Sequence, residues 1–119
     1  MKTSPDYVGI LLDKTKDNHQ LTRTIVHKLF AELPNQIADI DNALAKEEYS
    51  VAKEITHKLH GTVSFCGFVN FQTLAYGLEN SLVHNNTNEI KQNFTTLAHS
   101  VMSFIAQKEI LINDSRLLI

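Results

Sequence analysis

The 119-residue chain has no tryptophan, one cysteine, two prolines and four glycines. Its single cysteine, Cys66, excludes an intramolecular disulfide framework and a cysteine-rich zinc site. Because an all-β sandwich needs many turn residues, so few glycines and prolines argue against that fold. No apolar run approaches the roughly 18 residues that span a bilayer, and the first six residues lack the apolar segment of a signal peptide. These absences predict a single globular domain in the cytoplasm.

No sign of charge dominates, because eleven basic and thirteen acidic residues are mixed along the chain. Nucleic-acid binders usually carry a basic stripe that neutralises phosphates, and this chain has none. A glycine-rich loop that would cradle the phosphates of a nucleotide is also missing, which argues against an autonomous kinase. We therefore expect no nucleic-acid partner, no direct membrane contact and no enzyme activity of its own.

Apolar residues recur at helical spacing along nearly the whole chain, and no strand pattern competes. One stripe runs through Leu21, Ile25, Leu29 and Leu33, after which Pro34 is expected to separate two helices. Capping residues are expected at Asp17 or Asn18, at Gly67 and at Asn86. The expected helices cover about residues 7–11, 18–33, 37–44, 48–66, 71–82 and 90–108.

The connections between the expected helices are short, which favours antiparallel neighbours. The predicted fold class is all-α, an antiparallel up-and-down four-helix bundle with one or two short accessory helices. We expect this domain to cover residues 1–112 and to be followed by a short C-terminal tail at 113–119. The tail is unusually apolar at its end.

The helix expected over residues 48–66 carries a histidine on the face opposite its apolar stripe, where a side chain is expected to be exposed. Its apolar stripe runs through Ala52, Ile55, Leu59 and Val63, and His57 falls about 160° from the mean direction of that stripe. Residues at i, i+4 and i+7 share one face of a helix. That face therefore combines a histidine with two small residues, namely His57, Gly61 and Ser64.

Gly61 is expected to destabilise its helix, because a glycine inside a helix lowers helix stability by about 1 kcal/mol relative to alanine. On an exposed face its use would be to let another molecule approach the imidazole of His57 closely. Phe65 falls about 120° from the core direction, and Phe68 follows just after the helix. We interpret Phe65 and Phe68 as an apolar landing surface for a partner.

The segment from His57 to Gly67, His-Lys-Leu-His-Gly-Thr-Val-Ser-Phe-Cys-Gly, closely resembles the signature of histidine-containing phosphotransfer (HPt) domains. The resemblance covers about residues 18–82, and His60 stands where most of that family has lysine. The second histidine makes the segment similar to the HPt module of BarA/GacS-type hybrid sensor histidine kinases. Further matches to the family lie at Phe30, Leu33, Pro34, Ala43, Leu44, Leu74, Leu78 and Glu79.

This resemblance implies that His57 accepts a phosphoryl group from the aspartyl phosphate of a receiver domain and passes it to a response-regulator receiver. It implies a monomeric phosphoryl carrier without a cofactor of its own, because the receiver supplies Mg²⁺. Glu79 is expected to orient the ring of His57, whereas His60, Lys58 or Lys53 would contact phosphoryl oxygens. The subgroup suggests the cytoplasmic C-terminal domain of an inner-membrane hybrid kinase.

Two other functions stay open from the residues alone. The first is a metal site, because His57 and His60 lie three residues apart and His84 or His99 could join them. However, the chain lacks the His-Glu-x-x-His spacing of zinc proteases and shows no carboxylate that completes a ligand set. The second is a helical interaction module that carries no phosphate.

Overall fold

The computed structural model describes residues 4–118, and within this range the chain forms helices and no strand. No helix within these residues combines the length and the apolarity needed to cross a membrane. The helices are α1 (Tyr7–Lys14), α2 (His19–Ala45), α3 (Tyr49–Cys66), α4 (Val69–Val83), α5 (Thr87–Ile105), α6 (Lys108–Ile112) and the 3₁₀ helix η1 (Ser115–Leu117).

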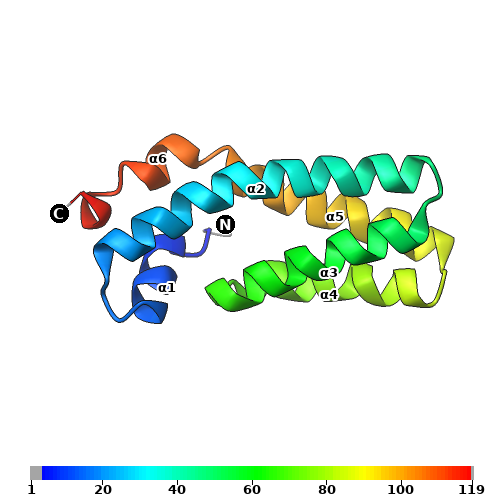
Figure 1. Cartoon of the computed structure of the whole chain (residues 1–119), viewed down its shortest axis with the longest axis horizontal. Coiled ribbons are helices and arrows are strands. Elements are labelled where there is room, and N and C mark those ends of the chain that lie inside the picture. The colour runs from blue at the N-terminus through cyan, green and yellow to red at the C-terminus, as the bar shows by residue number, and fades with distance from the viewer. Residues whose placement is uncertain (1–3, 119) are drawn as a thin grey trace.

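Four of these helices form an antiparallel bundle, as predicted (Figure 1). Helix α3 packs against α2 on one side and α4 on the other, and α5 closes the ring between α4 and α2. Helix α2 is longer than its neighbours and extends beyond the end of the α3–α4 pair (Figure 1). The accessory helices α1, α6 and η1 pack against this extension of α2.

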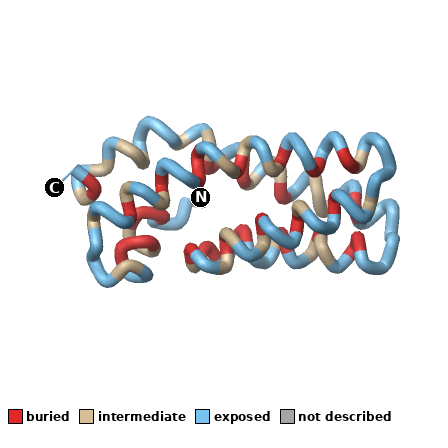
Figure 2. The backbone as a smooth tube through the Cα atoms, in the orientation of Figure 1, coloured by how far each residue is buried: buried red, intermediate tan, exposed pale blue. Residues whose placement is uncertain are grey.

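The core runs along the bundle axis, where each long helix turns one apolar stripe inward (Figure 2). Its aromatic end joins Tyr7 of α1 to three phenylalanines, with ring centroids 4.9 Å from Phe68, 5.6 Å from Phe71 and 4.8 Å from Phe104. Aromatic pairs at these separations stabilise a core beyond the area they bury. Helix α1 therefore closes one end of the bundle.

Three predicted helix ends are confirmed by their capping geometry. Asn18 accepts a hydrogen bond from the backbone N–H of Leu21 at 2.9 Å, and Asn86 accepts one from Glu89 at 3.2 Å. Each bond satisfies a backbone donor that the first turn of a helix leaves free. Gly67 follows α3 with a φ of 79°, the left-handed conformation that glycine adopts at low cost.

The expected break at Pro34 was wrong, because α2 continues through it as one 27-residue helix. Proline has no N–H to donate to the carbonyl of Phe30, and in a helix interior it costs about 3 kcal/mol. The same face buries Leu33 just before the proline and Ile37 just after it. Asn35 also donates from its side chain to the carbonyl of Ala31 at 3.2 Å. Burial on both sides of Pro34 thus outweighs the lost bond.

The expected burial of Leu21 was also wrong, because its side chain is 46% exposed. At this end of α2 the neighbours are α1 and η1 rather than α3. The buried face of α2 at this end therefore differs from the predicted stripe, and Thr22 and Val26 are buried in place of Leu21. Periodicity located the helix but could not show which neighbour covers its first turns.

The C-terminal part of the chain differs from the single long helix and tail that were expected. Helix α5 ends at Ile105, and the short α6 then lies against α2. Within 113–118, Leu117 is fully buried, and Arg23 of α2 donates from Nε to the carbonyl of Leu117 at 2.8 Å. Leu117 thus covers the extension of α2, whereas Leu118 is exposed. The domain boundary at residue 112 stays a prediction, and Ile119 lies outside the described residues.

Candidate functional site

His57 stands near the middle of α3, on the face directed away from the core. Thr56 and Leu59 are buried on either side of it, which fixes the rotation of the helix. The side chain of His57 is 73% exposed, as its position opposite the apolar stripe predicted. The rigid core of the bundle therefore presents this imidazole to the surroundings of the protein.

The ring of His57 is held by a carboxylate from the neighbouring helix. Its Nδ1 lies 2.7 Å from Oε2 of Glu79 in α4, and the Glu79 side chain is only 20% exposed. A carboxylate oxygen only accepts, so the hydrogen of this bond belongs to Nδ1. The neutral ring then carries its lone pair on Nε2, which makes Nε2 the nucleophilic atom.

Packing between helices sets the position of Glu79. Helix α4 runs antiparallel to α3, and its core residues Ala75 and Leu78 are fully buried. On its other side, Asn93 of α5 donates from Nδ2 to the carbonyl of Gly77 at 3.1 Å. The backbone that carries Glu79 is thereby tied to two neighbouring helices.

A shallow hollow of about 410 Å³ lies beside His57 on the side nearer the start of α3. Lys53 lines this hollow one turn before His57, and within residues 4–118 it forms no ion pair. Lys58 lines a separate groove between α2 and α3, although it lies 3.8 Å from Glu54, a carboxylate that also lines the hollow of His57. The structure thus brings Lys53, and not Lys58, into the hollow of His57.

Gly61 lies one turn after His57, and it is exposed. Beyond its chain neighbours and the adjacent helix backbone, a Cβ atom built on Gly61 meets no atom within 4 Å. Packing within the chain therefore does not require glycine here, although an exposed alanine would stabilise the helix. The bare backbone leaves an open path along α3 to His57.

A groove of about 510 Å³ between α2 and α3 borders Gly61. Its floor includes the buried residues Leu29 and Cys66, and Phe65 forms one wall with 74% of its surface exposed. Burial raises the pKa of the Cys66 thiol to about 11, so the thiol stays protonated and unreactive at neutral pH. The groove and Phe65 together form an exposed apolar surface close to His57.

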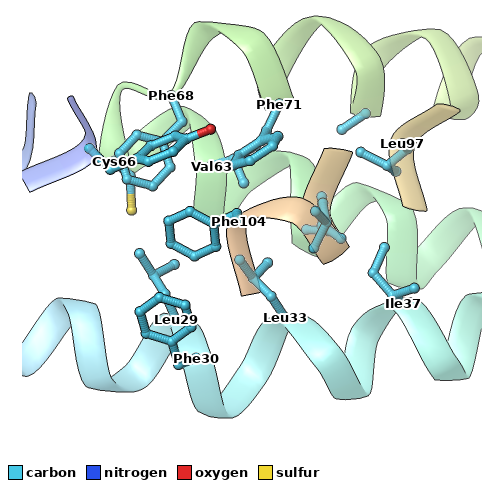
Figure 3. Close-up of a cluster of buried hydrophobic side chains, with 14 of the residues drawn as sticks. Leu29, Phe30, Leu33, Ile37, Val63, Cys66, Phe68, Phe71, Leu97 and Phe104 are labelled. Carbon is cyan, nitrogen blue, oxygen red and sulfur yellow. The ribbon is translucent and has the colours of Figure 1, made fainter. Parts of the chain in front are cut away.

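Phe68 does not belong to that surface, and its predicted role in docking was wrong. Its side chain is fully buried in the aromatic cluster, with ring centroids 6.1 Å from Phe71 and 5.9 Å from Phe104 (Figure 3). The left-handed turn at Gly67 reverses the chain after α3, and Phe68, the residue just before α4, points inward. The pair expected on one surface is therefore divided between surface and core.

The remaining predicted residues lie close to His57 in different surroundings. Ser64 is partly buried and lines neither the hollow nor the groove. His60 is 24% exposed, and its Nδ1 lies 3.2 Å from Oε1 of Glu79. Tyr76 of α4, which the sequence did not single out, stacks obliquely near His60 with ring centroids 6.2 Å apart. Tyr76 lies three residues before Glu79, and this spacing, which puts both on one helix face, could have indicated that Tyr76 lies near the site.

The alternative of a metal site finds no grouped ligands in the part of the chain that the structure describes. Within residues 4–118, no group of three or more histidine, cysteine, aspartate or glutamate side chains is arranged to hold a metal ion. His84, one of the residues considered for such a site, directs Nδ1 to the carbonyl of Asn80 at 2.9 Å. That nitrogen is therefore already engaged within α4 and its cap.

The fold and the site together define a class of protein, a helical bundle that displays on one exposed helix face an imidazole oriented by a carboxylate. A comparison with protein-family models identifies this class, because the model of the Hpt domain matches residues 24–108. The chain therefore belongs to the Hpt domain family. Searches of curated proteins and of solved structures gave no significant match.

Membership in this family establishes the general function of the chain, histidine phosphotransfer in a phosphorelay of two-component signalling. Hpt domains carry phosphoryl groups and exchange them with receiver domains. Because they are carriers rather than catalysts, the absence of a nucleotide-binding loop in the sequence is consistent with this function.

Proposed function

We propose that His57 is the phospho-acceptor, and that its Nε2 attacks the aspartyl phosphate of a docked receiver domain. The observation that carries the proposal is the 2.7 Å contact between Nδ1 of His57 and Glu79, on a side chain that is 73% exposed. This contact fixes the tautomer and the ring orientation while Nε2 stays open to a partner. No other histidine within residues 4–118 combines such exposure with a carboxylate on Nδ1.

In the transfer, an N–P bond forms at Nε2 while the P–O bond to the receiver aspartate breaks, and the aspartate leaves as a carboxylate. The imidazole gains positive charge during this step because the hydrogen on Nδ1 is retained. The negative charge of Glu79 stabilises the ring as that charge develops. The reverse reaction transfers the phosphoryl group to the receiver of a response regulator.

Most of the transition-state charge in phosphoryl transfer lies on the transferred group, and its stabilisation comes mainly from positioning and electrostatics. In this proposal the aspartate and the magnesium ion belong to the receiver, and the domain acts as a monomer without a cofactor of its own. Lys53 adds a positive charge in the hollow beside His57. We propose that the domain works in the cytoplasm as the HPt module of a BarA/GacS-type hybrid sensor kinase, and the second histidine, His60, supports this proposal.

Incubation with a panel of phosphorylated receiver domains tests the assignment. A cognate receiver should give an acid-labile, base-stable phosphoprotein with the wild type and none with His57→Gln. His99→Gln is the matched control, because His99 is exposed on α5 away from Glu79. Unfolding in urea should show that His57→Gln keeps the bundle intact. Phosphate uptake by His57→Gln would refute the assignment.

A further inference from the structure

The carboxylate of Glu79 contacts two histidines, His57 and also His60. Oε2 lies 2.7 Å from Nδ1 of His57, and Oε1 lies 3.2 Å from Nδ1 of His60. The two histidines stand three residues apart on α3, so both rings reach the same side chain of α4. One carboxylate therefore has each of its oxygens next to a different imidazole.

The two rings differ in what surrounds them. His57 is 73% exposed, whereas His60 is 24% exposed and lies against the ring of Tyr76. Tyr76 and Glu79 are three residues apart on α4, so His60 fits between two side chains of one helix face. The surroundings thus restrict the ring of His60 while that of His57 projects from the surface.

We propose that His60 is a positioning residue, which holds the carboxylate of Glu79 in place and does not itself contact the phosphoryl group. This inference rests on the proposed role of His57. A glutamate side chain loses considerable rotational freedom when it is fixed, and a contact at a single oxygen leaves it free to rotate. The second contact, at Oε1, restricts that rotation and keeps Oε2 on Nδ1 of His57.

The charged groups on the other side of His57 support this division of roles. Among residues 4–118, the cation that lines the hollow of His57 is Lys53, which approaches from the N-terminal side of α3 and shares the hollow with Glu54. His60 does not line that hollow and instead lines a separate one with Val69, Thr73 and Tyr76. Nδ1 of His60 lies 3.2 Å from Oε1 of Glu79.

Rapid-mixing phosphotransfer from an excess of a phosphorylated receiver tests the proposal with four variants. His60→Leu removes the nitrogen beside Oε1 of Glu79, and His60→Asn keeps an N–H group near the position of Nδ1. Glu79→Ala removes the shared carboxylate, and the fourth variant combines it with His60→Leu. Tyr76→Phe serves as the control, because it keeps the ring beside His60 and removes only the hydroxyl.

His60→Leu should lower the maximal transfer rate by up to about fivefold, the effect of losing a partly exposed ion-pair contact. The receiver concentration at half-maximal rate should stay unchanged, and His60→Asn should restore most of the rate. If His60 acts through Glu79, its replacement should cause no further loss in the Glu79→Ala background. Nitrogen-15 shifts of His57 should show a smaller Nδ1–H tautomer fraction in His60→Leu.

Two results would overturn the proposal while leaving His57 as acceptor. If the losses from His60→Leu and Glu79→Ala multiply in the double variant, His60 acts independently of Glu79, as a phosphoryl contact would. If His60→Leu transfers at the wild-type rate with an unchanged tautomer fraction, the 3.2 Å contact has no positioning role. Failure of the assignment of His57 looks different, because His57→Gln would then still be labelled.

Discussion

The Nδ1 atom of His57 lies 2.7 Å from a carboxylate oxygen of Glu79, a residue 22 positions later on the neighbouring helix. This contact links the fold to the chemistry, because only the packing of α3 against α4 brings the two side chains together. It assigns the hydrogen to Nδ1 and leaves Nε2 as the nucleophile. Predictions about the site therefore start from Glu79.

Glu79→Ala should lower the rate of phosphotransfer to His57 by about tenfold, because the ring loses both its orientation and the stabilising charge. Glu79→Gln should lose less, since the amide oxygen can still accept from Nδ1 but carries no full charge. Contacts of a largely exposed histidine contribute little to folding, so the free energy of unfolding should hardly change. Transfer kinetics and urea titrations measure both effects, and equal rates for all three proteins would contradict the role of Glu79.

Gly61→Ala should stabilise the fold and impair transfer at the same time. The added Cβ meets nothing within 4 Å, so the variant should gain about 0.5–1 kcal/mol in the free energy of unfolding. The same methyl group narrows the approach to His57, and the larger side chain of Gly61→Leu should reduce transfer further. Wild-type transfer rates in Gly61→Leu would show that the open backbone is not used by a partner.

Phe65→Ala and Phe68→Ala form a matched pair that the sequence could not distinguish. Phe65 is exposed beside the groove, so its loss should weaken binding of the receiver and leave stability almost unchanged. Phe68 is fully buried, so its loss should cost about 3–5 kcal/mol of stability. Calorimetric titration with a receiver and unfolding in urea separate the two. An unchanged affinity of Phe65→Ala would contradict the landing surface.

Lys53→Ala should slow phosphotransfer more than Lys58→Ala does. Lys53 lines the hollow beside His57 without an ion pair among the described residues, whereas Lys58 lies 3.8 Å from Glu54. A positive charge near the transferred phosphoryl group lowers the energy of its transition state. Transfer rates at a saturating receiver concentration compare the two variants, and the reverse order of effects would show that Lys58 is the contacting cation.

The stability of the fold should depend on pH through an ion-pair cluster at the far end of the bundle, formed by Arg116, Asp6 and Asp114 and called the clasp here. Arg116 lies 2.8 Å from both Asp6 and Asp114, and its hydrogen bonds lower the pKa of each carboxyl. In the unfolded chain these carboxyls titrate near their ordinary pKa of about 3.9. Because the folded-state pKa values are lower, the clasp stabilises the fold fully above that pH and loses its effect as the pH falls through them.

Arg116→Ala tests this dependence. The variant should be less stable than the wild type at about pH 7, and the difference should shrink at an acidic pH well below the ordinary carboxyl pKa of about 3.9, as the two carboxyls become protonated. Urea titrations at the two pH values measure the difference. A difference that is equal at both would show that Arg116 stabilises the fold by packing alone. The clasp joins the chain before α1 to the segment after α6, so it fixes both accessory regions.

The sequence predicted the bundle and the exposure of His57 because both depend on periodicity within one helix. It also predicted the caps at Asn18, Asn86 and Gly67, since capping is set by neighbouring residues. The prediction of a helix break at Pro34 failed. Burial of Leu33 and Ile37 against other helices outweighs the local tendency of proline to end a helix.

The surroundings of His57 were predicted only in part. The relation of Glu79 to His57 was expected from the family resemblance, but the second contact to His60 and the place of Tyr76 depend on how α4 is rotated against α3. Phe65 and Phe68 are three residues apart and equally apolar, so only the reversal of the chain at Gly67 separates their roles.

Nuclear magnetic resonance of the phosphorylated, nitrogen-15-labelled domain tests most directly that Nε2 of His57 accepts the phosphoryl group. After transfer from a cognate phosphorylated receiver, phosphorus–nitrogen coupling should appear at Nε2 of His57, while Nδ1 keeps its hydrogen towards Glu79. Coupling at Nδ1 of His57, or phosphate on any other residue, would contradict this assignment.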